Sequence, residues 1–189
     1  WQSVKRVRAV ILFVLTLMAF LIIYGAYLAY LPFLMEQSFQ ASSWEIGLTM
    51  SVMSMATAVA SSQLGTLSGW LGKNLLLQLA CVCYALALVT IPLSPTIWSL
   101  LVPVVVLGVG QGLSIPSLQT LLASRAPLEH RGAFMAVNGV ALRLGQTLGP
   151  ILMGLVYSHW AVDGAFYAAA LVAVGMLALT TITASREED

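Results

Sequence analysis

The chain has 189 residues, of which 60% are apolar and 8% carry a formal charge. Soluble domains average about 25% charged residues, so 8 Lys and Arg with 7 Asp and Glu are too few for a water-facing surface. With a net charge of +1 and a mean hydropathy of +0.95, this composition excludes a soluble enzyme, a disordered chain and a nucleic-acid binder, and favours a polytopic membrane protein.

Six segments are long and apolar enough to cross a bilayer as helices, which takes about 20 residues each. Their predicted ranges are about 9–34, 46–70, 74–93, 97–123, 133–157 and 162–184. The apolar runs are continuous, whereas the strands of membrane barrels alternate. The sequence therefore predicts an all-α bundle of six transmembrane helices, forming a single domain over residues 1–189.

Basic residues fall on one side of this predicted bundle. If the N-terminus is cytoplasmic, the outer connections at about 35–45, 94–96 and 158–161 contain no Lys or Arg. Seven of the eight basic residues then share the inner side: Lys5, Arg6, Arg8, Lys73, Arg125, Arg131 and Arg186. Cytoplasmic segments of membrane proteins carry such an excess, so we expect both ends of the chain to be cytoplasmic.

Glycines recur at a spacing of four residues inside the predicted helices. This spacing lets two helix backbones approach closely in lipid. We interpret the following residues as packing positions, with ligand contact as the alternative: Gly108, Gly112, Gly145, Gly149 and Pro150. The second and fifth predicted helices also resemble each other weakly, as an inverted repeat of three plus three helices would require.

Polar side chains within the predicted helices are the candidates for a substrate cavity, because such groups turn toward partners or water. Tyr24 and Tyr27 lie three residues apart on the first helix, and tyrosines can stack on flat or cationic compounds. Gln111 lies halfway along the fourth helix, where it either binds substrate or ties that helix to a neighbour. Asn138 and Gln146 are the further candidates, on the fifth helix.

Arg143, also a cavity candidate, is the one basic residue inside a predicted helix. A charge at that depth must pair, meet water or extend toward the membrane surface. All seven carboxylates lie in loops, the tail or helix ends, so this chain supplies no acid at the same depth. Arg143 therefore pairs with helix carbonyls or another part of the protein, or it serves an anionic group or a proton-binding acid across the cavity.

The inner loop GTLSGWLGKN at 65–74 resembles the degenerate second copy of the major facilitator loop motif. Gly65, Leu67, Gly72 and Lys73 match that motif. Gly69 stands at the acidic position of the motif, so we do not expect its charge relay here.

The segment 125–154 is similar to the stretch that joins the tenth and eleventh helices of major facilitator drug exporters. The matching residues are Pro127, Glu129, Arg131, Gly132, Arg143, Gly145, Gly149, Pro150 and Gly154. The first predicted helix, with YGAYLAYLPFLMEQ, resembles the seventh helix of the same family. The similarity runs through nearly the whole chain in order.

This resemblance implies the C-terminal six-helix half of a twelve-helix transporter that works by alternating access. It implies gating or loop-motif roles for Gly65, Gly72, Lys73, Arg131 and Gly132. The expected partners are the lipid bilayer, the N-terminal half of the same polypeptide, a small-molecule substrate and protons. No cofactor, metal or nucleic acid is expected, and the expected location is a bacterial cytoplasmic (inner) membrane.

The function that fits best is efflux of small hydrophobic compounds coupled to protons. A metabolite permease or uniporter of the same family is one alternative, and a non-transporting scaffold or a standalone dimerising half is another. An intramembrane enzyme would need clustered acids or histidines, or a nucleophile beside a base, within the helices. The predicted helices contain no such cluster, so we expect no enzymatic activity.

Overall fold

The computed structural model describes residues 2–126, 129 and 131–188, and helices account for nearly all of them. These described residues contain no strand, which confirms the prediction of an all-α fold. Pro127, one of the motif positions, lies outside them.

The first helical rod is continuous from α1 (Gln2–Ile22) through η1 (Ile23–Tyr30) to α2 (Leu31–Phe39). Most of the side chains on this rod are large aliphatic or aromatic groups. The middle segment η1 is a π-helix, whose wider turn changes the register of the side chains that follow α1. The rod ends at Gln40, whose backbone is left-handed with φ 49°.

A reciprocal cap starts the next helix, α3 (Ser43–Ser62). The Ser42 hydroxyl accepts a hydrogen bond from the backbone N–H of Glu45, and the Glu45 carboxylate accepts one from the backbone N–H of Ser42. After a break at Gln63, α4 (Leu64–Leu71) ends at Gly72, whose φ of 76° favours glycine. The helix α5 (Lys73–Thr90) follows directly.

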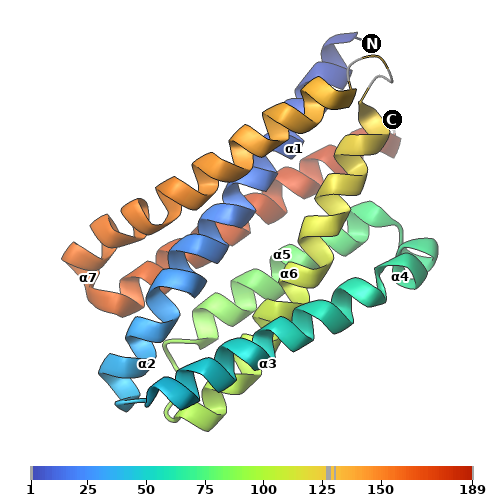
Figure 1. Ribbon diagram of the computed structural model, residues 1–189. Helices are drawn as coiled ribbons and strands as arrows, with labels where there is room; N and C mark the ends of the chain where they lie inside the picture. Colours follow the sequence, from blue (N-terminus) through green and yellow to red (C-terminus); the bar gives the residue numbers. More distant parts are fainter. Residues whose placement is uncertain (1, 127–128, 130, 189) are drawn as a thin grey trace.

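Two long helices complete the chain. A similar cap between Thr96 and Ser99 starts α6 (Ile97–Arg125). The last helix, α7 (Arg131–Glu188), is interrupted at Trp160 and Ala161, where the backbone is not helical. The chain reverses at this turn, so α7 consists of a first part (131–159) and a second part (162–188) (Figure 1).

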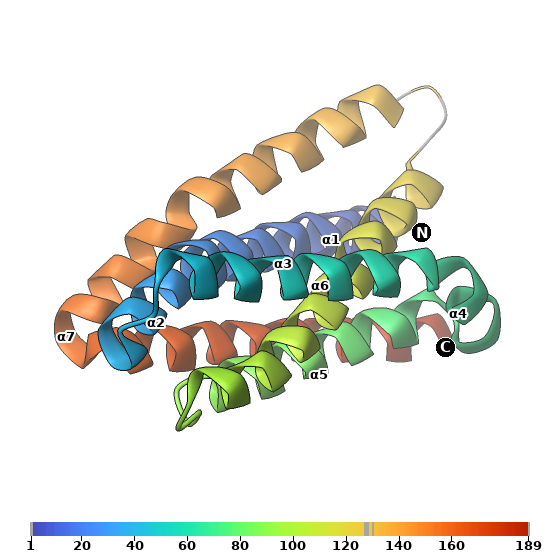
Figure 2. The same cartoon turned by 60° about the horizontal axis from the view of Figure 1, so that its bottom comes forward.

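The helices run lengthwise along the bundle, so that their ends lie at two opposite ends of it. Both chain termini, α4, the end of α6 and the start of α7 lie at one end, whereas α2 and the turn of α7 lie at the other (Figures 1 and 2). α1 packs against α7, and both α3 and α5 pack against α6. The core between them contains the buried side chains of Leu15, Ile22, Leu31, Tyr84 and Phe166.

Four helical stretches among the described residues are long and apolar enough to cross a membrane. They are Ala9–Phe39, Lys73–Thr90, Ile97–Ser124 and Arg131–Ile182. The last stretch contains the turn at Trp160 and Ala161, and therefore both parts of α7. α3 is 20 residues long but rich in serine and threonine, which lowers its hydropathy.

Candidate functional site

Two close helix pairs frame the candidate site, and the first is α3 with α6. A Cβ built on Gly108 would lie 2.7 Å from the carbonyl oxygen of Met53, a distance that real Cβ atoms essentially never show. The hydroxyls of Thr57 and Ser61 donate hydrogen bonds to the carbonyl oxygens of Gly108 (3.1 Å) and Gly112 (3.0 Å). Backbone contact and interhelical hydrogen bonds therefore hold α3 on α6.

The second close pair is α1 with the first part of α7. A Cβ built on Gly145 would lie 2.9 Å from the Cβ of Phe20, and one built on Gly149 would lie 2.8 Å from the carbonyl oxygen of Leu21. Pro150 follows within the same helix. These contacts set the position of α1 and η1, and with it the aromatic side chains that η1 presents.

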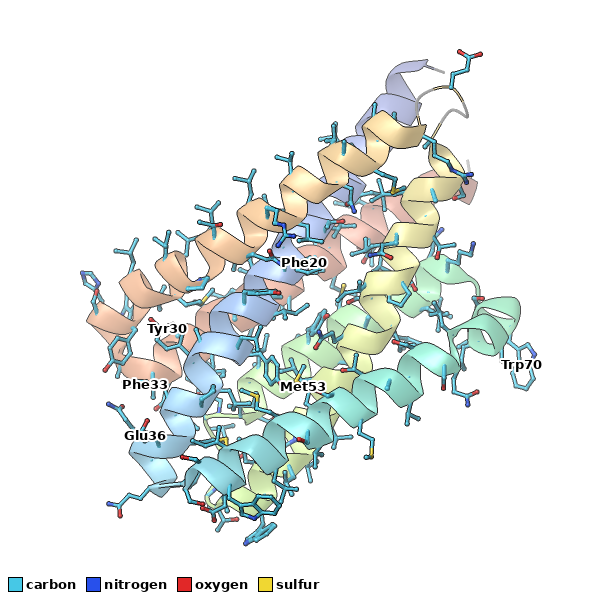
Figure 3. The ribbon with its side chains drawn as sticks, in the orientation of Figure 1. Phe20, Tyr30, Phe33, Glu36, Met53 and Trp70 are labelled. Carbon is cyan, nitrogen blue, oxygen red and sulfur yellow. The ribbon has the colours of Figure 1, made fainter. Side chains whose placement is uncertain are left out.

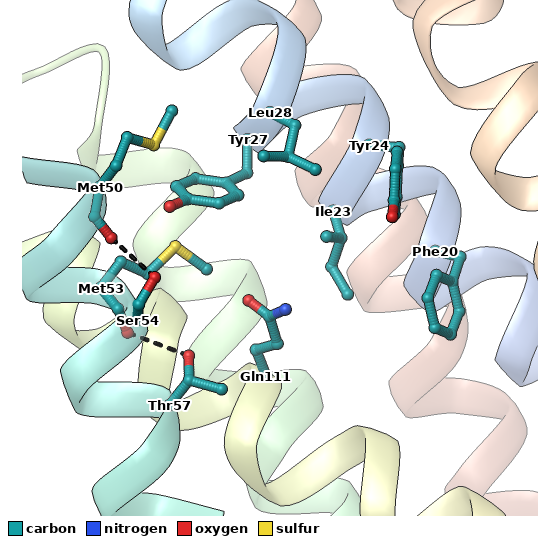
Figure 4. A pocket seen from close by; sticks show the side chains of 10 residues that line it. All are labelled: Phe20, Ile23, Tyr24, Tyr27, Leu28, Met50, Met53, Ser54, Thr57 and Gln111. Atoms are coloured by element: carbon teal, nitrogen blue, oxygen red, sulfur yellow. Dashed lines mark hydrogen bonds between the residues drawn. The ribbon is translucent and has the colours of Figure 1, made fainter. Parts of the chain in front are cut away.

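A cavity of about 450 Å³ opens between η1, α3 and α6 (Figure 4). The structure brings the predicted cavity residues Tyr24, Tyr27 and Gln111 together there. The other lining residues are Phe20, Ile23, Leu28, Met50, Met53, Ser54 and Thr57. This lining contains no Asp, Glu, Lys, Arg or His, so the walls of the cavity carry no formal charge.

Helical spacing explains how each wall forms. On α3, Met50, Met53, Ser54 and Thr57 follow the i, i+3, i+4, i+7 pattern of one helix face. On the opposite wall, Tyr24 and Tyr27 both belong to η1. The resulting walls are made of aromatic rings, flexible thioethers and a few hydroxyls, which suit apolar and aromatic compounds of varied shape.

Two hydroxyls of the cavity already form hydrogen bonds within the described part of the protein, whereas one side-chain amide does not. The Ser54 hydroxyl donates to the carbonyl oxygen of Met50 (2.9 Å), and the Thr57 hydroxyl contacts the carbonyl oxygens of Met53 (3.0 Å) and Gly108. The side-chain amide of Gln111 has no hydrogen-bond partner among the described residues and projects into the cavity (Figure 4). An amide both donates and accepts, so Gln111 can hold a polar group of a ligand.

Tyr30, the next tyrosine along η1, is not part of this cavity. Its ring packs against Phe33 and Tyr157, with centroids 6.3 and 5.8 Å apart. Figure 3 shows Tyr30 and Phe33 together near the α2 end of the bundle, with Phe20 farther along the rod. Tyr30 therefore has a packing role.

Asn138, Arg143 and Gln146 lie on the first part of α7 and do not line the cavity. Asn138 is buried, and its Oδ1 has no hydrogen-bond partner among the described residues. Arg143 is exposed, and its Nη1 donates to Oε1 of Gln146 at 2.9 Å. The structure thus separates these three residues from Tyr24 and Gln111.

The predicted loop-motif residues lie at the end of the bundle that holds the termini. A Cβ built on Gly65, Gly72 or Gly132 would meet no atom within 4 Å. Lys73 is exposed at the start of α5. Arg131 donates from Nε and Nη2 to the carbonyl oxygen of Ala123 (3.2 and 2.9 Å), which connects the start of α7 to the end of α6.

Sequence reasoning did not select several residues of the cavity. Phe20 precedes Tyr24 by four residues, so helical spacing could have placed it on the same face. Ser54 and Thr57 gave no signal, because hydroxyl residues in membrane helices commonly bond to their own backbone. Met50 and Met53 suit an adaptable apolar wall by their type, but methionine is equally ordinary at packing positions, so the sequence left both roles open.

Comparisons with known proteins agree with this architecture. The family model described as Major Facilitator Superfamily matches residues 12–189. Among curated proteins, the "Uncharacterized MFS-type transporter YhjO" of Bacillus subtilis is 30% identical over 101 residues, which cover 53% of this chain and 25% of that protein. The "Multidrug resistance protein MdtG" of Proteus mirabilis is 26% identical over 126 residues, which cover 67% of this chain and 31% of that protein. The chain therefore matches about a quarter to a third of the length of these relatives.

Proposed function

Because the chain belongs to the Major Facilitator Superfamily, we propose that it forms part of a secondary transporter that exports small hydrophobic compounds by alternating access. The uncharged cavity carries this proposal. Aromatic rings and methionines surround its one unpartnered amide, on Gln111. A sugar or an organic acid would need several polar or charged contacts, which these walls do not offer.

We propose that the single domain of 189 residues crosses the membrane six times. The crossings are the rod from α1 to α2, then α3 with α4, α5, α6 and the two parts of α7. Such a domain is one half of a twelve-helix fold, built as an inverted repeat of three plus three helices. Lys73 and Arg131 lie at the end of the bundle that holds both termini, and the positive-inside rule makes this end cytoplasmic, in a bacterial inner membrane.

Coupling to protons belongs to the same proposal. The lining of the cavity contains no carboxylate or histidine that titrates near neutral pH. The proton carrier therefore resides in the N-terminal half that we propose completes the transporter. The name of the MdtG relatives, multidrug resistance protein, favours export over uptake.

An efflux assay tests the proposed function. The full-length protein is reconstituted in liposomes and given a panel of aromatic compounds, sugars and organic acids, with and without a proton gradient. We expect efflux of the aromatic compounds, accelerated by the gradient. Transport of sugars or organic acids alone would instead identify a metabolite permease, and movement of no compound would favour a non-transporting module.

A matched pair of tyrosine variants connects this activity with the cavity. Tyr24→Ala removes a ring from the cavity, whereas Tyr167→Ala removes an exposed ring from the second part of α7. We expect a lower rate of efflux in the first variant and the wild-type rate in the second. Equal rates in both variants would place the substrate path elsewhere.

A further inference from the structure

Pro116 interrupts the backbone hydrogen bonding of α6 just over one turn beyond Gln111. Proline has no backbone N–H, so the carbonyl four residues earlier, that of Gly112, loses its regular helical partner. Gly112 is buried and belongs to the stretch Ile97–Ser124, which is long and apolar enough to cross a membrane. The bilayer core offers no water in place of the missing donor, so a side chain of the protein has to supply one.

Ser61 of α3 supplies this donor. Its hydroxyl donates to the carbonyl oxygen of Gly112 at 3.0 Å. A Cβ built on Gly112 would lie 2.8 Å from the Cβ of Ala60 and 3.1 Å from the backbone nitrogen of Ser61, so the close approach depends on glycine. The bond from Thr57 to Gly108 spans the same 51 residues, so the two bonds hold α3 and α6 parallel and in one register.

The bond from Ser61 differs from those of its neighbours on α3. The hydroxyls of Ser54 and Ser62 donate to carbonyls of their own helix. Thr57 also reaches α6, but its acceptor keeps the N–H four residues later as a regular helical partner. The hydroxyl of Ser61 therefore replaces a missing bond, whereas that of Thr57 adds a second one.

The carbonyl that Ser61 holds belongs to the residue next to Gln111. The Gln111 amide lines the cavity and projects into it (Figure 4). Gly110, on the other side of Gln111 in the sequence, packs on α5, where a Cβ built on it would lie 3.1 Å from the carbonyl oxygen of Ala80. Contacts with α3 and α5 thus limit the rotation of α6 at the level of Gln111.

We infer that Ser61 is a positioning residue, which replaces the hydrogen bond that Pro116 removes and thereby fixes the direction in which Gln111 enters the cavity. Without the hydroxyl, the Gly112 carbonyl is buried and unpaired, and α6 has to turn or shift to find another donor. The amide then moves relative to the tyrosines on the opposite wall. The inference rests on the proposed function, in which Gln111 contacts the substrate, and it adds a residue outside the cavity that decides specificity.

Denaturant titrations of the purified full-length protein test the link between Ser61 and Pro116. We expect Ser61→Ala to lower the ratio of folded to unfolded protein about tenfold, because a buried carbonyl is left unpaired. Pro116→Ala restores an N–H that bonds to the Gly112 carbonyl within α6, so in that background Ser61→Ala should lower the ratio by no more than about twofold.

Thr57→Val is the control for these titrations. It removes a bond from α3 to α6 whose acceptor does not depend on Pro116, so its loss should be the same in both backgrounds. A Ser61→Ala protein that folds only together with Pro116→Ala would support the inference as well. An equal loss for Ser61→Ala with and without Pro116→Ala would overturn it.

Binding of carbazole and fluorene to the full-length protein tests the positioning of Gln111. The two compounds share one ring skeleton, and carbazole carries an N–H where fluorene has a methylene group. We expect Ser61→Ala to raise the Kd of carbazole about threefold, to leave that of fluorene unchanged, and to have no further effect in a Gln111→Leu background. Ser62→Ala removes an exposed hydroxyl next to Ser61 and should change neither Kd.

Two results of the binding experiment would overturn the inference. One is an equal rise of Kd for both compounds in Ser61→Ala, and the other is a further rise on top of Gln111→Leu, since each would give Ser61 a merely structural role. If the wild-type protein bound neither compound, the proposed function would fail, whereas the titrations would still decide the link between Ser61 and Pro116.

Discussion

Gly25 and Gly149 lie in backbone contact where η1 crosses the first part of α7. A Cβ built on Gly25 would lie 2.9 Å from the carbonyl oxygen of Gly149, and one built on Gly149 would lie 2.9 Å from the nitrogen of Gly25. Tyr24, the neighbour of Gly25, lines the cavity. The contact between the two glycines therefore helps fix the position of the η1 wall of the cavity.

Gly149→Ala should destabilise the protein because its methyl group would overlap the backbone of η1. Overpacking of this kind costs about 1–3 kcal/mol. Gly139→Ala, on the same helix, meets no atom within 4 Å and gains up to about 1 kcal/mol of helix propensity. Thermal unfolding of the purified protein in detergent should give a lower Tm for the first variant only. Equal Tm values would mean that α1 and α7 are not in close contact.

Thr57→Val should weaken the pairing of α3 with α6. The substitution keeps the shape of the side chain but removes the hydroxyl that contacts the carbonyl oxygen of Gly108. Interhelical hydrogen bonds in membranes contribute about 0.6 kcal/mol on average, so we expect a loss of that order in a denaturant titration. Ser54→Ala is the control, because the Ser54 hydroxyl donates only within its own helix. A larger loss for Ser54→Ala than for Thr57→Val would contradict this assignment.

The all-helical fold was predictable because an apolar run long enough for a bilayer needs no tertiary information. Details of the helices were harder. The second helix was predicted at about 46–70 from hydropathy, whereas α3 starts at Ser43 and ends at Ser62, with a break at Gln63. The start could have been found from Ser42 and Glu45, which have the S-x-x-E spacing of a capping box. The π-helix η1 was not predictable, because neither propensity nor hydropathy distinguishes a π-helix from an α-helix.

The candidate site was predictable only in part, because residue type alone does not show how the helices pack. Tyr24, Tyr27 and Gln111 stand out by type within apolar helices, and they share one cavity. Arg143 stands out equally, yet it lies on a separate groove. Residue type tells that a side chain needs a partner, whereas the packing of helices decides which partner it meets.

Acid should weaken the cap of α3. Hydrogen bonds from the backbone N–H (2.8 Å) and the hydroxyl (2.7 Å) of Ser42 lower the pKa of Glu45, which precedes the predicted membrane segment. A carboxyl with a lowered pKa in the folded state stabilises the fold above its unfolded pKa of about 4.3, and this contribution is lost as the pH falls through the folded pKa. Wild-type protein should therefore unfold at a higher temperature than Glu45→Gln at pH 7. This difference in unfolding temperature should disappear as the pH falls toward 3. Glu36→Gln removes an exposed carboxylate at the same end of the bundle and is the control for the loss of one negative charge there. If the difference in unfolding temperature between wild type and Glu45→Gln did not change with pH, the Glu45 carboxylate would not cap the helix.

Gln111→Leu should change which compounds the transporter handles. The Gln111 amide is unpartnered in the cavity, so its replacement by an apolar side chain of similar size costs the free protein little. A bound compound that hydrogen-bonds to the amide loses about 0.5–1.5 kcal/mol, or somewhat more if its polar group is left buried without a partner. We expect the KM for such compounds to rise about threefold to tenfold, while compounds without hydrogen-bonding groups keep the wild-type KM. Gln119→Leu, on an exposed position of the same helix, should leave both KM values unchanged. A uniform rise for every compound would instead mean that Gln111 holds α6 in place rather than contacting the substrate.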